Sequence, residues 1–346
     1  MTADTSHSGY AAIRSTLLGA VMDRLIVRDV SASALLAKHG ISFGLLKNPY
    51  THLSMNEYIG FLESAAEMTE DEHIGARIGA DMRAGDLGPM GILLSLSGSI
   101  YAGLDRINRS VRAIQTGTES SFVDYQDELC WSYRILDNRI QSRRQDAEFS
   151  LVSTVQVIRN NFLRRWAPQQ VHFEHAAPKN TQFLEQYFGC PVLYGQATNR
   201  LVLDRAPLMD QYRVEDTALV EMLERHIADL IGTAPRQSTL TEAVCSIVSS
   251  SLGLRPISVE RVAEALGLSP RNLQRKLGDE GTSLRVILDD IRRDRAEVLL
   301  TERSIPMGEI ACALGYSDGT AFWRAHKRWS AQKPRDVRIN SRPHLS

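Results

Sequence analysis

The spacing of apolar residues near the end of the chain predicts a helix that is buried on one side and basic on the other. Within residues 321–329, three apolar side chains recur at helical intervals: Phe322, Ala325 and Trp329. This spacing places them on one face. Three cations fall on or beside the opposite face: Arg324, Lys327 and Arg328. The apolar face can anchor the helix while the cations meet an anionic partner.

A short apolar helix is expected just before this basic helix. Residues 310–317 read Ile-Ala-Cys-Ala-Leu-Gly-Tyr-Ser. Gly315 permits a tight turn, and Ser317 is expected to cap the following helix. A helix, a glycine turn and a capped basic helix together predict a helix-turn-helix.

The same pattern occurs once earlier, in residues 262–277. The matched positions are 48 residues apart before the turn and 49 after it. They are Val262 with Ile310, Ala263 with Ala311, Leu266 with Leu314, Gly267 with Gly315, Ser269 with Ser317, Leu273 with Phe322 and Arg275 with Arg324. The chain therefore holds two copies of one unit.

The segment Thr282–Thr301, which joins the two copies, predicts a single amphipathic helix. Its apolar side is expected to carry Leu284, Ile287, Leu288, Ile291, Ala296 and Leu299. Its arginines are expected to lie largely off that side. Three of them should be solvated or paired with nearby carboxylates: Arg292, Arg293 and Arg295, with Asp289, Asp290, Asp294 and Glu297.

The first two-thirds of the chain mixes helical and strand patterns, which predicts an α+β domain. Helices are expected at Val30–Lys38, Ser54–Met68 (with Ser54 and Glu57 as a capping box), Leu104–Gln115, Ala147–Trp166 and Glu215–Ile231. Strands are expected at Ser121–Gln126, Cys130–Leu136, Val171–His175, Val192–Tyr194 and Leu201–Leu203. Gly85–Gly91 should be a turn, and Gly232–Ser238 a linker.

The near-neutral total charge hides an asymmetry. The segment from Arg236 to the end has 18 basic and 13 acidic residues, whereas the part before it has 22 basic and 28 acidic residues. A basic module joined to an acidic one suits a nucleic-acid reader that carries a second domain. The polar Met1–Gly9 segment and the lack of a long apolar run predict a cytoplasmic protein with no membrane span.

Enzymatic signatures are absent from the sequence. It has no metal-binding triad, nucleophile elbow or phosphate loop, and Gly85–Gly91 lacks the spacing of a dinucleotide fingerprint. Its four cysteines are scattered: Cys130, Cys190, Cys245 and Cys312. We therefore expect neither catalysis nor a cofactor or metal.

The segment 255–338 resembles the DNA-binding domain of the AraC/XylS family of bacterial transcription regulators. The likeness rests on Ile310-Ala311, Leu314 to Ser317, Phe322, Arg324-Ala325, Lys327 to Trp329 and Pro334. Two positions depart from the family pattern. His326 stands where an aromatic or apolar residue is usual, and Ala331 stands where glycine usually ends the helix.

The preceding part resembles the N-terminal effector domain of one AraC subgroup. The likeness rests on the glycine-rich turn, Trp166-Ala167-Pro168, Val171-His172-Phe173 and Phe188 to Val192. It implies an α+β sensor domain followed by an all-α DNA-binding domain with two helix-turn-helix units joined by a long helix. The expected parts are residues 1–30 (tail and first helix), 31–210 (effector sensing), 211–237 (coupling helix and linker) and 238–340 (DNA binding).

The outward positions of the two basic helices are the expected DNA contacts. They are Arg271, Asn272, Gln274 and Arg275 in the first unit, and Asp318, Thr320, Trp323, Arg324, Lys327 and Arg328 in the second. Arg suits guanine and Gln suits adenine in the major groove. Lys327, Arg328 and Lys333 suit phosphates, because long cations position a protein better than they read bases.

The effector pocket is harder to predict, and four residues are candidates: Trp131, Tyr133, Glu148 and His172. A cationic effector needs a carboxylate and aromatic rings. An acidic effector needs a basic group instead. The sequence therefore leaves an amine, an amino acid or an organic acid open.

These observations predict a ligand-responsive transcription activator. Its partners would be promoter DNA, RNA polymerase, a small-molecule effector and a possible second copy of the chain, on the bacterial nucleoid. Two alternatives share the DNA-binding repeat. One is a DNA-alkylation-repair enzyme, which needs a nucleophilic or zinc-bound cysteine. The other is an architectural protein without a ligand.

Overall fold

The computed structural model describes residues 11–28, 30–125, 128–137, 139–140, 142–232, 239–302 and 304–329. They form two compact units that interleave along the chain. Unit 1 comprises Met1–Glu119, Arg134–Trp166 and Ala206–Ala234, and unit 2 comprises Ser120–Tyr133, Ala167–Arg205 and Pro235–Ser346. The predicted domain boundaries at residues 31–210, 211–237 and 238–340 stay a prediction. Most of the predicted linker, together with Ala331 and Lys333, lies outside the described residues.

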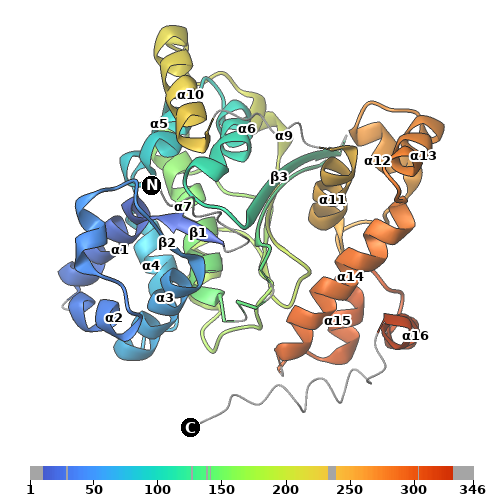
Figure 1. The fold of residues 1–346 in the computed structure, drawn as a ribbon, viewed down its shortest axis with the longest axis horizontal. Helices are drawn as coiled ribbons and strands as arrows, with labels where there is room; N and C mark the ends of the chain where they lie inside the picture. The colour runs from blue at the N-terminus through green and yellow to red at the C-terminus, as the bar shows by residue number, and fades with distance from the viewer. Residues whose placement is uncertain are drawn as a thin grey trace, which may run out of the picture. The chain divides into compact units, whose positions relative to one another are not determined.

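Unit 1 is mainly helical (Figure 1). A two-stranded antiparallel sheet joins β1 to β2. The elements are β1 (Ala12–Arg14), α1 (Ser15–Val27), α2 (Ala32–Lys38), η1 (Phe43–Lys47), β2 (His52–Ser54), α3 (Met55–Thr69), α4 (Ile74–Ala80), η2 (Ala84–Leu87), α5 (Gly88–Leu96), α6 (Ile100–Ser110), η3 (Val111–Ala113), α7 (Arg144–Asn161) and α10 (Thr217–Ile231). The short α9 (Arg205–Met209) begins at the last residue of a unit 2 segment.

Two glycines on α4 let this helix lie directly on α7. A Cβ added to Gly75 would be 2.2 Å from the carbonyl oxygen of Gln145. One added to Gly79 would be 2.8 Å from that of Phe149. The two glycines are four positions apart, so they share one face of α4. Backbones this close leave no room for a side chain between the helices.

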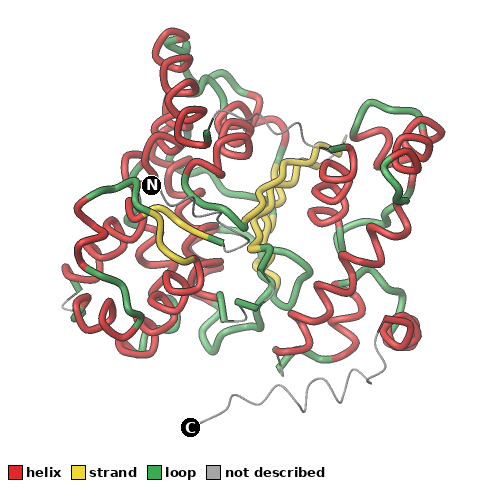
Figure 2. Tube along the Cα trace, viewed as in Figure 1, coloured by secondary structure: helices red, strands yellow, loops and turns green. Residues whose placement is uncertain are grey.

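A five-stranded sheet has the order β3-β4-β7-β5-β6, shown as yellow strands in Figure 2. β7 pairs antiparallel with both β4 and β5, whereas β5 and β6 are parallel. Most of this sheet belongs to unit 2. Its strands are β3 (Thr118–Tyr125), β4 (Glu128–Ile135), β5 (Gln170–His172), β6 (Val192–Leu193) and β7 (Asn199–Leu203), with α8 (Gln182–Phe188) between β5 and β6.

The other helices of unit 2 share one hydrophobic core. They are α11 (Leu240–Ser251), α12 (Val259–Ala265), α13 (Pro270–Asp279), α14 (Leu284–Thr301), α15 (Met307–Ala313) and α16 (Gly319–Trp329). Val123 and Ala197, from the sheet segments of unit 2, belong to the same core. The predicted fold class, a mixed α+β part followed by a helical part with a long connecting helix, is confirmed.

The predicted duplication is visible in the packing of the described residues. Gly267 and Gly315 have φ values of +63° and +72°, which suit glycine at the turn of each unit. Matched apolar positions are buried in both copies: Val262 and Ile310, Ala263 and Ala311, Leu273 and Phe322. The same offset pairs Leu277 with His326, and both are buried. His326 is therefore a packed histidine at a core position.

Several elements of unit 1 differ from the prediction. Ser54 precedes α3 but makes no side-chain cap, so the capping box is wrong. The glycine-rich stretch is not only a turn, because α5 already begins at Gly88 with Pro89 in its first turn. The helix α1 lies within residues 1–30, where a first helix was expected, whereas α4, α8, α9 and α11 were not predicted. The sequence did not predict α4 because its two glycines, which serve helix packing, resemble the glycines of a loop.

We expect Gly75→Ala to lower the free energy of unfolding by about 1–3 kcal/mol or more, because the methyl group must push α4 away from α7. Gly19→Ala is the matched control. Gly19 lies within α1 with no other atom within 4 Å of the added Cβ, so this substitution should stabilise by up to about 1 kcal/mol. Chemical denaturation of both variants measures the difference. Equal effects would contradict the close packing.

Candidate nucleic-acid interface

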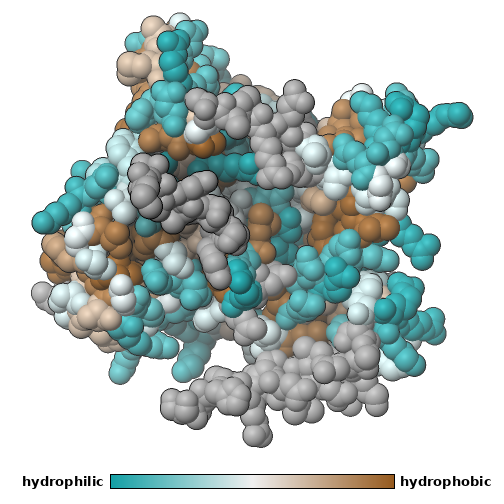
Figure 3. Space-filling model, in the orientation of Figure 1, coloured by the Kyte–Doolittle hydropathy of each residue, from teal (hydrophilic) through white to brown (hydrophobic). Residues whose placement is uncertain are grey.

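The α13 helix is anchored by one face and exposed on the other. Ser269 accepts a hydrogen bond from the backbone N–H of Asn272 and so caps the helix as predicted, with Pro270 in the first turn. Leu273 and Leu277 are buried in the core. The exposed side chains are Arg271, Asn272, Gln274, Arg275 and Lys276. Figure 3 shows a largely hydrophilic surface over this helix.

Arg275 has an intrahelical partner. Its guanidinium lies 2.9 Å from the carboxylate of Asp279, one turn further along. Both side chains are more than 60% exposed. An ion pair in water contributes little. Arg275 can therefore exchange Asp279 for another anion at small energetic cost.

The α16 helix repeats this arrangement in the second helix-turn-helix. Phe322 and Ala325 are buried, and the His326 ring packs against Phe322 and Trp329, with centroids 5.8 and 6.4 Å away. The opposite side is exposed: Thr320, Trp323, Arg324, Lys327 and Arg328. The Lys327 ammonium lies over the Trp323 ring, 5.4 Å from its centroid. The sequence thus correctly separated the buried and exposed faces of both basic helices.

Asp318, predicted to contact DNA, serves as the cap of α16. Its carboxylate accepts hydrogen bonds from the backbone N–H of Ala321 (2.8 Å) and from the hydroxyl of Ser317 (3.1 Å). These bonds, the backbone one foremost, lower the pKa of Asp318. The prediction that Ser317 caps this helix is wrong, because Asp318 stands one residue closer to it. A DNA contact of Asp318 stays a prediction.

Arg292 was expected to be solvated or paired with a carboxylate. It instead binds the turn between α15 and α16 to α14. Its guanidinium donates to the carbonyl oxygens of Leu314 (3.0 Å) and Gly315 (3.1 Å). It also lies over the Tyr316 ring, 4.3 Å from the centroid. Carbonyls at the end of a helix lack intrahelical donors. Arg292 supplies such a donor and ties the turn before α16 to the connecting helix.

The other two arginines of α14 behave differently from each other. Arg293 is exposed and pairs with Asp290 at 2.9 Å, as predicted. Arg295 is buried and pairs with Glu174 at 2.8 Å, so its predicted solvated position is wrong. Arg295 follows Ile287 and Ile291 at intervals of four, which places all three on the same face. This spacing was the signal that sequence reasoning missed.

The structure separates the effector candidates of unit 2. In the sheet register Trp131 lies opposite Leu201, whereas His172 lies opposite Arg200. Directly paired residues share a face and neighbours along a strand alternate. His172 therefore points away from the face that carries Trp131 and Tyr133. All three are buried, and burial lowers the pKa of His172 to about 3, with a further effect of Arg200.

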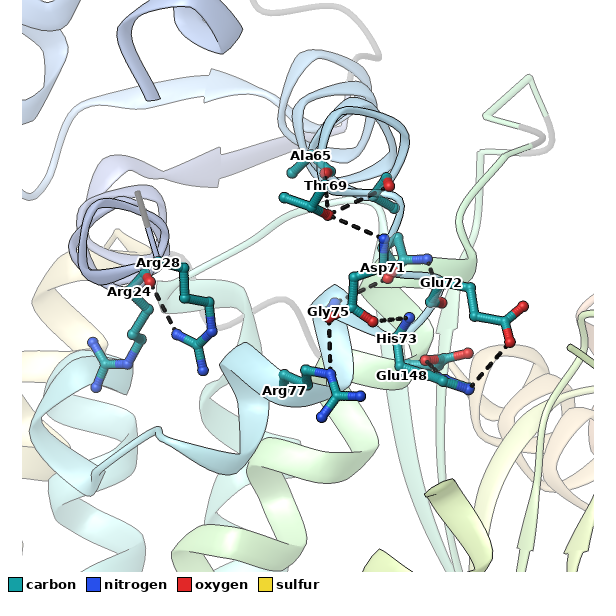
Figure 4. Close-up of polar contacts among 12 residues, drawn as sticks. Arg24, Arg28, Ala65, Thr69, Asp71, Glu72, His73, Gly75, Arg77 and Glu148 are labelled. Atoms are coloured by element: carbon teal, nitrogen blue, oxygen red, sulfur yellow. Dashed lines mark hydrogen bonds and ion pairs between the residues drawn. The ribbon is translucent and has the colours of Figure 1, made fainter. Parts of the chain in front are cut away.

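Glu148, the fourth candidate, is fully buried in a polar cluster of unit 1 (Figure 4). Its carboxylate lies 3.0 Å from Nδ1 of His73 and 2.8 Å from Nε of Arg144. Arg144 also donates to the backbone carbonyl of Glu72. The cluster joins the loop before α4 to the start of α7. Glu148 therefore has a structural role here, and effector binding by any of the four candidates stays a prediction.

Comparison with known proteins matches both halves of the chain to family models. Residues 30–211 match the arabinose-binding domain of AraC transcription regulators, N-terminal. Residues 262–340 match a helix-turn-helix domain. The first match alone covers more than half of the chain. No described helix is long and apolar enough to cross a membrane, and no group of three or more His, Cys, Asp or Glu in the described residues is placed to hold a metal.

Similar proteins include two curated regulators and a solved structure. The chain is 24% identical to the transcriptional regulator VirS of Mycobacterium tuberculosis over 330 residues, 94% of this chain and 96% of VirS. It is 30% identical to the ornithine utilization regulator of Pseudomonas aeruginosa over 169 residues, 49% of this chain and 50% of that protein. The crystal structure of the transcriptional regulator CdpR from P. aeruginosa aligns with a TM-score of 0.40 at 21% identity, covering 89% of this chain and 96% of CdpR.

We expect Asp318→Ala to lower the Tm by about 2–4 °C, because the first turn of α16 loses its cap. Ser317→Ala is the matched control and should leave the Tm nearly unchanged. Since the folded-state pKa of Asp318 is lowered, its contribution is present above the unfolded pKa and is lost as the pH falls through the folded value. Thermal scans at neutral and acidic pH measure both effects. A larger fall in Tm for Ser317→Ala than for Asp318→Ala would show that Ser317 caps the helix.

A second prediction concerns Glu63 on α3, whose carboxylate accepts a hydrogen bond from the backbone N–H of Gln145. Burial raises its pKa from 4.5 to about 7, and the charged neighbours with smaller effects are Arg144, Glu148 and Asp146. A raised pKa contributes stability below the unfolded value and loses it as the pH rises through the folded value. Between pH 4.5 and 7.5, the free energy of unfolding of the wild type should therefore fall by about 1–3 kcal/mol more than that of Glu63→Gln.

Glu67→Gln is the matched control for this measurement. Glu67 lies one turn further along α3, is 75% exposed and pairs with Lys38 at 3.4 Å. Its variant should follow the wild-type pH profile of the unfolding free energy. If the profiles of Glu63→Gln and Glu67→Gln coincide, Glu63 does not titrate near neutral pH.

Proposed function

Because the chain belongs to the AraC family of transcription regulators, we propose that it reads promoter DNA with the exposed faces of α13 and α16. The observation that carries this proposal is the duplicated pattern of burial. Each helix buries its apolar residues in the unit 2 core and leaves a row of cations in water, joined on α13 by the amides of Asn272 and Gln274. The family does not favour the repair-enzyme or architectural alternatives.

In the first unit, α13 supplies the base-reading groups. Arg271, Gln274 and Arg275 are exposed on one helix. A guanidinium can donate two hydrogen bonds to guanine, and an amide can pair with adenine in the same bidentate way. Ser269 and Pro270 fix the start of the helix, and a major-groove helix contacts bases mainly with its N-terminal residues. Asn272 lies beside these groups.

In the second helix-turn-helix, α16 contacts fewer bases and more phosphates than α13 does. Gly319 offers no side chain, so Thr320 and Arg324 are the base readers. Trp323, held under the Lys327 ammonium, gives van der Waals contact to a base or sugar. Lys327 and Arg328 neutralise phosphates and release counterions. Two such helices joined by α14 would enter successive major grooves, about 34 Å apart.

The effector domain regulates DNA binding in response to a ligand. A small molecule of the amine, amino acid or organic acid class would bind it and shift the protein between states of different DNA affinity. The name of the ornithine utilization regulator, which matches half of this chain, fits an amino acid class. RNA polymerase is the proposed partner at the promoter, on the nucleoid. The α10 helix is the proposed element for coupling or pairing with a second copy.

We expect Arg275→Ala and Arg324→Ala each to relax base preference at one half of the site, because each removes one bidentate donor worth about 1–3 kcal/mol. Lys327→Ala should weaken all duplexes alike and lower the salt slope by about one. Selection from a random duplex library, followed by equilibrium titration at several salt concentrations, measures both.

Arg109→Ala is the matched control, because Arg109 is 62% exposed on α6 in unit 1. It should leave the selected sequence and the affinity unaltered. The proposed readers are wrong if the Arg275 and Arg324 variants select the wild-type sequence with wild-type affinity. The proposed function itself is wrong if the wild-type protein enriches no sequence.

A further inference from the structure

The sheet of unit 2 contacts α11, the first helix of the DNA-reading part, through a buried arginine. Arg200, on β7, is fully buried. Its guanidinium donates to the carbonyl oxygens of Ser250 and Leu252, the latter at 2.7 Å. These carbonyls stand at the end of α11, where backbone acceptors lack intrahelical donors and the helix dipole is negative. A cation from the sheet thus completes the C-terminus of the first helix of the DNA-reading part.

A buried ion pair makes the second contact. Glu174, two residues past β5, accepts a hydrogen bond from Arg295 of α14 at 2.8 Å, and the two residues are 6% and 3% exposed. Charge-assisted hydrogen bonds of this kind are short and directional. An ion pair away from water holds one relative placement of its partners, because any shift leaves two charges without solvent. It therefore fixes the connecting helix against the sheet.

A third contact reaches the second helix-turn-helix unit. A Cβ added to Gly195, in the turn between β6 and β7, would be 3.2 Å from the side chain of Ile305. Ile305 is buried in the common core just before α15. Val123 and Ala197 add apolar contact to that core. The sheet therefore contacts α11, which precedes the first helix-turn-helix, then α14, which connects the two, and Ile305, which precedes the second.

We propose that these sheet residues, Glu174, Gly195 and Arg200, form a brace that holds the two reading helices at the mutual spacing needed to bind both half-sites at once. None of the three lies on a reading helix, so they are positioning residues. The inference rests on the proposed function. It adds that α14 alone does not set the spacing, and that the brace belongs to the DNA-reading body.

Polar contacts suit this task better than apolar ones. An apolar surface tolerates small slides of one element over another, whereas the Arg200 bonds and the Glu174–Arg295 pair have fixed directions. Arg292 plays a similar part within the second unit, where it ties the turn at Leu314 and Gly315 to α14. The polar contacts from the sheet to α11 and α14, and from α14 to the turn before α16, thus each contain a buried or half-buried arginine bonded to defined oxygens.

The test compares full-length variants on two duplexes. One duplex carries the complete operator selected by the wild-type protein, and the other carries only the half-site read by α13. Glu174→Gln and Arg295→Met should each weaken binding to the complete operator at least tenfold and leave half-site binding within twofold. The double variant should be no weaker than the weaker single variant, because both substitutions remove one interaction. Arg200→Lys should fall between wild type and these variants.

Arg293→Met is the matched control, since Arg293 lies on the same helix in an exposed ion pair. It should bind both duplexes like the wild type. Far-ultraviolet circular dichroism at the titration temperature shows whether each variant is folded. If Arg295→Met does not fold, the conservative Arg200→Lys variant still tests the brace. The brace is refuted if folded variants bind the complete operator like Arg293→Met. It is also refuted if they lose operator and half-site binding equally. A wild-type protein that selects no operator would sink the proposed function instead.

Discussion

One-sided burial of two short helices is the constraint on which the rest of the DNA-reading part depends. Leu273 and Leu277 on α13, and Phe322 and His326 on α16, occupy matched core positions. A helix of 10 or 11 residues is marginal in water on its own. Packing of one face stabilises it, and the other face is then free to carry charge. The exposed arginines contribute almost nothing to the stability of the fold. The residue types at these positions can therefore be determined by DNA recognition.

The sequence was sufficient to predict this arrangement because both periodicity and duplication are local signals. Leu273 and Phe322 could be placed in the core from spacing alone. It was insufficient where a partner lies far along the chain. Arg295 was expected in water or paired with a nearby carboxylate, and although its spacing from Ile291 indicates a buried face, nothing in the sequence around it identifies Glu174, 121 residues away, as its partner. Asp318 was assigned to DNA because it holds an outward position of the second helix-turn-helix, and that position does not reveal its bonds to Ala321 and Ser317.

The sequence did not show which of the effector candidates lie together, for a related reason. Aromatic and acidic residues were chosen as pocket candidates by type, but type does not reveal which face of a sheet a residue occupies. The register shows that His172 shares its face with Arg200, and Trp131 does not. Glu148 similarly joins His73 and Arg144, which come from separate parts of the sequence. Strand order and helix crossing decide such sites, and both depend on long-range packing.

Placing the sheet within the DNA-reading body changes where a regulatory signal has to act. If the reading helices were attached to the rest of the protein only by a flexible linker, a ligand could alter little except their distance from it. A ligand can shift an equilibrium only by its difference in affinity for two states. Arg200 and Glu174 give the sheet a directional hold on α11 and α14. A small change in strand position therefore has a physical means of reaching both reading helices, because interfaces built from fixed hydrogen bonds switch between discrete arrangements more readily than they deform.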